Sequence, residues 1–125
     1  MSPLSWIGFV VAAAIGAPAR YIVDAHVEDR FEGSLPLGTF AVNISGSFLL
    51  GIVAGLFLHH GLSGSAKTIV GTGFVGAYTT FSTFTLEVVR LMEDGSIGEA
   101  MGTVAASLVV GCVAAGVGLW LASLL

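Results

Sequence analysis

Four long apolar stretches with almost no charge constrain the fold of this chain more than any other feature. They cover residues 4–25, 37–58, 66–92 and 97–125. A helix needs about 20 predominantly apolar residues to cross the hydrocarbon core of a bilayer, and each stretch is long enough to do so. The sequence therefore predicts an all-α membrane protein with four transmembrane helices, in a single domain that covers residues 1–125.

The composition agrees with a membrane location and excludes several classes of function. Hydrophobic residues make up 55% of the chain and charged residues only 10%, against roughly 25% charged in a soluble domain. The formal net charge of -4 excludes nucleic acid as a partner, because basic residues must neutralise phosphates there. The single cysteine, Cys112, cannot form an internal disulfide or a cysteine-based metal site. No Lys or Arg precedes the first stretch, so we expect a retained helix there rather than a cleaved signal.

The distribution of basic residues predicts the topology and the oligomeric state. Arg20, Arg30 and Arg90 flank two loops on one side, while Lys67 stands alone on the other. The positive-inside rule places the arginine side in the cytoplasm, but so few charges fix the orientation only weakly. A weak bias is compatible with insertion in both orientations, and four helices alone barely enclose a polar route. We therefore expect a homodimer, since two-fold dimers are the commonest oligomers, and the weak charge bias is compatible with an antiparallel, dual-topology arrangement of its two chains.

Polar side chains within the apolar stretches follow helical spacing. Thr39 and Asn43 lie four residues apart in the second stretch and share one helix face. Ser107 lies on a similar polar face of the fourth stretch. Ser and Thr can bond carbonyls of their own helix, but the carboxamide of Asn43 needs partners from elsewhere. The third stretch contains a cluster of hydroxyls at Thr79, Thr80, Ser82, Thr83 and Thr85. Together, these faces predict a hydrated or ion-lined path.

The segment 71–84 is the least suited to a continuous helix. Gly71, Gly73 and Gly76 precede the dense run of Thr and Ser, and both glycine and β-branched residues have low helix propensity. A broken helix at membrane depth is tolerated only where the freed backbone is buried or lines a cavity. We expect an unwound turn from Gly76 to Thr79, where free carbonyls can coordinate a cation and free amides can face an anion.

Four further residues are candidates for a role in this path. Phe81 and Phe84 lie three residues apart and project to the same side. Because aromatic rings are positive at the edge, the two rings can meet a small anion, although simple packing is the alternative. Glu87 is close enough to the membrane core to suggest a function, but it can equally pair with Arg90 or lie at the interface. Arg20 can attract anions or anchor the end of its helix.

Three motifs in this chain resemble the signatures of the Fluc/CrcB fluoride channel family. The first is Gly-Phe-Val-Gly-Ala-Tyr-Thr-Thr-Phe-Ser-Thr-Phe at residues 73–84. The others are Gly-Thr-Phe-Ala-Val-Asn at 38–43 and Gly-Ala-Pro-Ala-Arg-Tyr at 16–21. Their order and spacing agree with the family, and the resemblance covers essentially the whole chain. Ala77 departs from the pattern, because many members have a second glycine there.

The resemblance implies an antiparallel homodimer with two pores in the plasma (inner) membrane. Such a dimer exports cytoplasmic fluoride passively and protects the cell against its toxicity. By position, Phe81 and Phe84 correspond to ring-edge fluoride ligands and Asn43 to the pore-lining amide. The other residues that the resemblance places along the pore are Thr39, Ser82, Thr83, Ser107, Arg20 and Glu87. It also implies that backbone carbonyls of Gly76 and Thr79 from both subunits hold a structural sodium ion (Na+).

Two other functions remain compatible with four spans. The sequence contains no nucleotide-binding motif and no catalytic dyad, so it predicts neither a pump nor an enzyme. A small proton-coupled multidrug exporter is one alternative, but it needs a carboxylate in mid-membrane, and the first stretch contains none there. A non-transporting subunit of a membrane complex is the other. Close helix packing in such a subunit explains the glycines, but not the aligned polar faces.

Overall fold

The computed structural model describes all 125 residues, which form helices and short connections without any β-strand. Three helices are long and apolar enough to cross a membrane. They are α1 (Pro3–Glu28), α2 (Leu37–His59) and α6 (Ile97–Ser123). These helices confirm the first, second and fourth predicted stretches to within three residues at each end.

The third stretch is a broken helix, as predicted, but the break lies later than expected. Its elements are α3 (Gly64–Lys67), the π-helix η1 (Thr68–Val75), α4 (Gly76–Tyr78) and α5 (Ser82–Glu93). Gly76 is helical, with φ -62° and ψ -36°, whereas Thr79 is extended, with φ -77° and ψ 161°. The unwound segment, hereafter the break, is therefore residues 79–81 rather than Gly76 to Thr79.

The preceding glycines explain this difference, because they serve close packing rather than unwinding. Gly73 is buried in η1, and a Cβ atom there would lie 3.1 Å from the Phe9 carbonyl oxygen of α1. Gly71, also buried in η1, faces α2. The absence of side chains lets neighbouring helices approach η1, and this packing compensates for the low helix propensity of glycine.

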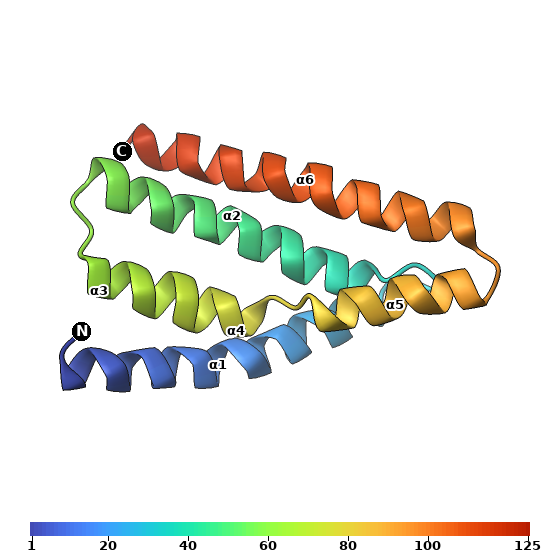
Figure 1. Cartoon of the computed structure of the whole chain (residues 1–125), viewed down its shortest axis with the longest axis horizontal. Coiled ribbons are helices and arrows are strands. Elements are labelled where there is room, and N and C mark those ends of the chain that lie inside the picture. The colour runs from blue at the N-terminus through green and yellow to red at the C-terminus, as the bar shows by residue number, and fades with distance from the viewer.

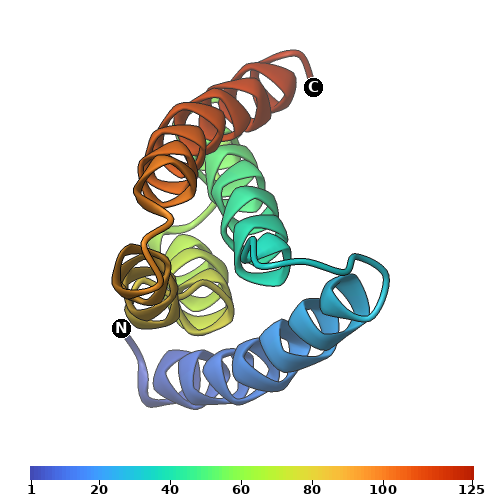
Figure 2. The same cartoon turned by 90° about the vertical axis from the view of Figure 1, so that its right-hand side faces the viewer.

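The helices α1, α2 and α6 and the broken third stretch run side by side, with both termini at the same end of the molecule (Figure 1). The most extensive contact between two helices is that of α2 with α6, and α1 packs along η1 and α4. Figure 2 shows an open arrangement rather than a closed bundle, and only 19 of the 125 residues are buried. Large apolar side chains cover much of the remaining surface, which suits a chain solvated by lipid or by a partner.

Two glycines of α2 allow α6 to approach closely. A Cβ atom on Gly51 would lie 2.9 Å from the Ala115 carbonyl carbon, and one on Gly55 would lie 2.6 Å from the Ala122 Cβ. The close approach of α2 and α6 therefore depends on these two glycines. Gly116 differs, because nothing in the chain lies within 4 Å of a Cβ at that position.

We predict that Gly51→Ala lowers the free energy of unfolding by about 1–3 kcal/mol, because the methyl group overlaps the α6 backbone. Gly98→Ala on α6 is the matched control, since nothing lies within 4 Å of a Cβ there. It should leave stability unchanged or raise it slightly, because alanine is the better helix former. Thermal unfolding in detergent, followed by circular dichroism, measures both. Equal losses of stability in Gly51→Ala and Gly98→Ala would contradict the role of Gly51 in helix packing.

Candidate functional site

Two hydrogen bonds between Asn43 of α2 and Thr80 organise the break. The Asn43 Nδ2 donates to the Thr80 carbonyl oxygen at 2.8 Å, and the Thr80 N–H donates to the Asn43 Oδ1 at 2.8 Å. The carboxamide therefore satisfies both backbone groups of a residue that has left the helix. The prediction that Asn43 needs a partner outside its own helix is confirmed. One N–H of its amide remains available to another acceptor.

The break leaves backbone groups of opposite character on its two sides. In a continuous helix the Thr80 N–H would bond the Gly76 carbonyl, but it bonds Asn43 instead, and no other backbone amide donates to Gly76. On the far side, the N–H groups of Phe81, Ser82 and Phe84 have no hydrogen-bond acceptor in the chain. The end of α4 thus presents carbonyl oxygens, while the start of α5 presents amides and the positive end of its helix dipole.

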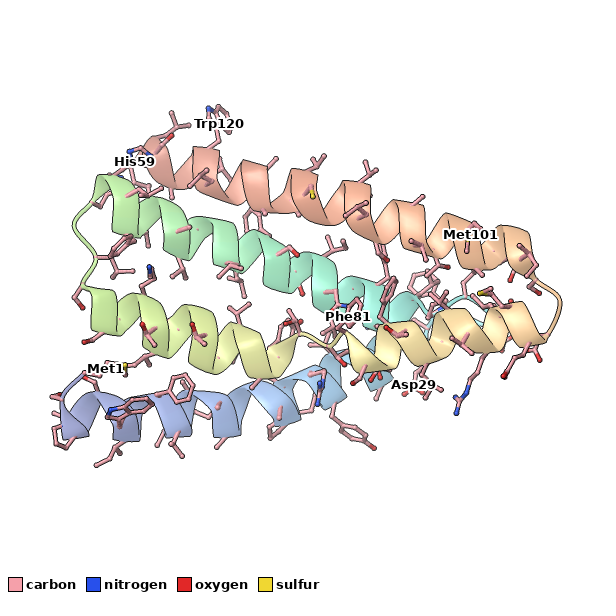
Figure 3. All side chains as sticks on the ribbon, in the orientation of Figure 1. Met1, Asp29, His59, Phe81, Met101 and Trp120 are labelled. Carbon is pink, nitrogen blue, oxygen red and sulfur yellow. The ribbon has the colours of Figure 1, made fainter.

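A cavity of about 320 Å³ brings together four of the predicted site residues. Asn43 comes from α2, Phe81 from the end of the break, Phe84 from the start of α5 and Ser107 from α6. The two phenylalanine rings have centroids 5.9 Å apart and are inclined by 39°. Phe81, the last residue of the break, is labelled in Figure 3, and it is 78% exposed. The cavity is therefore open on the side of Phe81.

Three other predicted residues lie in a second, smaller cavity rather than with the phenylalanines. Arg20, Thr39 and Thr83 line this space of about 220 Å³ between α1, α2 and α5, together with Thr80. The Arg20 Nη1 approaches the Thr79 carbonyl oxygen at 3.5 Å, a long hydrogen bond. Seven of the predicted pore residues are therefore divided between two cavities.

The Thr80 hydroxyl is the centre of a small network that the sequence analysis did not single out. It donates to the Thr83 Oγ1 at 3.2 Å, accepts from the Thr83 N–H at 3.3 Å and lies 3.4 Å from the Ser82 Oγ. Ser82 itself is exposed and lines neither cavity. Residues 79–85 contain five hydroxyls, and their spacing does not distinguish them. Only the tertiary contact with Asn43 identifies Thr80.

Glu87 is bonded to α2 rather than to a cation. The Thr39 hydroxyl donates to the Glu87 Oε1 at 3.0 Å, while the Oε2 is buried without a hydrogen-bond partner. The expected alternative of pairing with Arg90 is therefore not realised. A further cavity of about 450 Å³ is lined by Glu87 and Arg90 together with Asp24 and Glu28 of α1.

Asp24 and Glu28 were not candidates from the sequence, although a signal for them exists. Together with Arg20 they recur every four residues, which places all three on one face of α1. The Gly38 N–H at the start of α2 donates to the Glu28 Oε1 at 2.8 Å. Glu28 thus caps α2 from a neighbouring helix, where Pro36 provides no side-chain cap.

Comparisons with known proteins agree with the motifs. The family model described as "CrcB-like protein, Camphor Resistance (CrcB)" matches residues 7–119. A protein of Leifsonia xyli subsp. xyli named "Fluoride-specific ion channel FluC 1" is 44% identical over 99% of this chain and 90% of its own length. "Fluoride-specific ion channel FluC 2" of Mycobacterium tuberculosis is 44% identical over 95% of this chain and 91% of its own length. With residues 7–119 matched and relatives aligned over nearly their full lengths, this multi-pass membrane protein belongs to the CrcB family.

Proposed function

We propose that this chain forms a fluoride-selective channel that exports cytoplasmic fluoride passively and thereby protects against its toxicity. The observation that carries the proposal is the cavity in which Asn43, Phe81, Phe84 and Ser107 converge beside the break. The names of the relatives, each a fluoride-specific ion channel, support the choice of ion. The family argues for a channel rather than an enzyme.

The chemistry of the cavity suits a small, strongly hydrated anion. Fluoride must exchange its water for other hydrogen-bond donors, and the second N–H of Asn43 and the Ser107 hydroxyl supply them. The rings of Phe81 and Phe84 add positive edges, and the unpaired amides at the start of α5 lie next to them. None of these groups carries a full positive charge, so no single site binds fluoride too tightly for conduction.

The driving force in this proposal is the membrane potential. It amounts to about 2.3 kcal/mol per elementary charge for each 100 mV. Fluoride enters the cell as neutral HF, ionises in the cytoplasm and leaves through the channel as the anion. A proton-coupled exporter fits less well, because the acids of α1, Asp24 and Glu28, lie in its last two turns and Glu87 lies toward the end of residues 64–93, rather than in mid-membrane.

We further propose that residues 64–93 form a fourth span and that two antiparallel copies form the channel. Residues 64–93 run alongside α2, and the break is the only interruption of their helical path. Phe81 is 78% exposed in the single chain, although a fluoride ligand must be shielded from lipid. A second copy placed against this open side would complete the cavity, and two-fold symmetry would create two equivalent pores.

Replacement of a cavity ring tests the channel proposal. In liposomes containing the purified protein, Phe81→Ile should slow fluoride efflux by about fivefold, because the loss of a ring-edge contact removes roughly 1 kcal/mol of stabilisation from the ion in the pore. Phe31→Ile, in the exposed loop before α2, is the control and should leave efflux unchanged. A fluoride electrode follows the release. No fluoride efflux from well-folded wild-type protein would overturn the proposal.

Cysteine labelling tests the dual topology. The variant Ser96→Cys, made in a Cys112→Ala background, places a single cysteine in the turn before α6. An impermeant maleimide added outside intact cells should label only about half of these chains. The remaining half should react after permeabilisation, because equal numbers of chains insert each way. Leu62→Cys, in the loop between α2 and α3, should give the same division. Complete labelling from one side at either position would rule out dual insertion.

We also propose that Gly76 and Thr79 contribute backbone carbonyls to a structural Na+ at the dimer centre. The donor set fits a hard cation, since the Gly76 carbonyl has lost its helical amide partner to Asn43. The Thr79 carbonyl accepts only the long bond from Arg20, and its second lone pair is free. A bound cation would neutralise these oxygens where the two broken helices meet.

Removal of sodium tests this cation site. When N-methylglucamine replaces sodium on both sides of the membrane, we expect a lower melting temperature of the dimer and slower fluoride efflux. A ligand that binds only the folded dimer stabilises it, by about 2.7 kcal/mol at one hundred times its dissociation constant. Restoring sodium should reverse both changes, whereas potassium should restore them less well. Identical melting temperatures with and without sodium would contradict the site.

A further inference from the structure

Tyr78, the last residue of α4, makes a buried polar contact with α2 directly before the break. Its side chain is only 6% exposed, and its hydroxyl lies 2.8 Å from the Ser45 Oγ. The ring stacks on Phe74 one turn earlier, with centroids 5.8 Å apart and planes inclined by 8°. The tyrosine is therefore fixed both by its own helix and by its neighbour.

The direction of this hydrogen bond follows from the other partner of Ser45. The Ser45 hydroxyl donates to the Val42 carbonyl oxygen at 3.1 Å, which uses its only proton. The Ser45 oxygen consequently accepts the bond, and the Tyr78 hydroxyl donates it. Tyr78 then has a single acceptor in a buried position. Loss of that acceptor leaves a buried donor unsatisfied, which costs more than the simple absence of the bond.

This contact and the Asn43–Thr80 contact hold the third stretch in one register on α2. Ser45 pairs with Tyr78 before the break, and Asn43 pairs with Thr80 within it. The two segments run antiparallel, because the later α2 residue, Ser45, pairs with the earlier residue of the third stretch, Tyr78. Directly after Ser45, a Cβ atom on Gly46 would overlap the side chain of Thr79, which lies between Tyr78 and Thr80. The chain around the break is thus pinned to α2 over three consecutive residues.

The first helix supports the same segment from the opposite side. Gly16 of α1 is buried, and a Cβ atom there would lie 3.1 Å from the Tyr78 backbone nitrogen and 3.2 Å from the Ala77 Cβ. The end of α4 is therefore enclosed between α1 and α2. With so little space on the α1 side, the hydrogen bond to Ser45 determines where Tyr78 sits along α2.

We propose that Tyr78 is a positioning residue for fluoride conduction, which acts through its hydrogen bond to Ser45. The bond, hereafter the Tyr78–Ser45 latch, keeps Thr80 on Asn43 and thereby keeps the Phe81 ring beside Phe84. The inference rests on the proposed channel function and adds a residue that does not itself touch the ion. If the latch opens, the cavity loses its geometry although each of its lining residues is still present.

A double-mutant cycle on full-length protein in liposomes tests the latch. Ser45→Ala leaves the buried Tyr78 hydroxyl without an acceptor, and we expect fluoride efflux to slow about tenfold. Tyr78→Phe removes the hydroxyl while Ser45 still bonds Val42, and we expect a loss of only about threefold. The double variant has no orphaned group and should match Tyr78→Phe, so that the second substitution rescues the first. Losses that multiply in the double variant would overturn the proposal.

Ser123→Ala is the matched control for this cycle. The Ser123 hydroxyl also donates to the carbonyl three residues earlier, at 2.6 Å from the Trp120 oxygen, but it contacts no tyrosine. Its removal should leave efflux at the wild-type rate. All rates are taken per folded dimer, with melting temperatures measured in parallel. Variants that melt earlier but conduct normally would show that Tyr78 only stabilises the fold, and would overturn its positioning role.

Hydrogen exchange separates failure of the latch from failure of the channel proposal. The Thr80 amide is protected by its bond to the Asn43 Oδ1. We expect its exchange to be fastest in Ser45→Ala, where the latch is open and the buried Tyr78 hydroxyl has no acceptor, and to slow to the Tyr78→Phe rate in the double variant, which has no orphaned hydroxyl. Unchanged exchange in Ser45→Ala would refute the latch even if the wild type conducts fluoride. Accelerated exchange without any wild-type efflux would support the latch and refute the channel.

Discussion

The structure depends on the satisfaction of one unwound peptide at membrane depth. Within the hydrocarbon region, each backbone group without a partner costs several kcal/mol. The Asn43 carboxamide meets that constraint, because it bonds both the N–H and the carbonyl of Thr80 at 2.8 Å. No hydroxyl could do so with the same geometry, since a carboxamide has a donor and an acceptor side by side. The break is therefore possible only where α2 presents this side chain.

The helix α2 is the element on which the other parts of the molecule are arranged. On one side its glycines let α6 approach to backbone contact. On another side it bonds the third stretch through Thr39, Asn43 and Ser45. Its small residues and its polar residues thus serve different neighbours. The cavity with the phenylalanines lies between these neighbours, and for this reason its residues come from α2, the break, α5 and α6.

Much of the fold and part of the site could be predicted from the sequence. The ends of α1, α2 and α6 followed from apolar length, because a bilayer imposes a minimum length on every crossing. A break in the third stretch followed from its glycines and hydroxyls, but its position did not. The glycines suggested unwinding at Gly76, whereas the structure uses Gly71 and Gly73 for packing and unwinds at Thr79. Helix propensity is a local property, and packing against α1 and α2 outweighs it here.

The sequence by itself determined that this is a membrane protein, that its polar groups lie on a few helix faces and that Asn43 needs a partner. Each of these conclusions follows from the cost of polar groups in hydrocarbon, which applies before any fold is known. Only the tertiary structure decided that the partner is Thr80, that Glu87 bonds Thr39 and that Arg20 and Phe81 line different cavities. These choices depend on the register between helices. That register is set by contacts such as Gly46 with Thr79, between residues far apart in the chain.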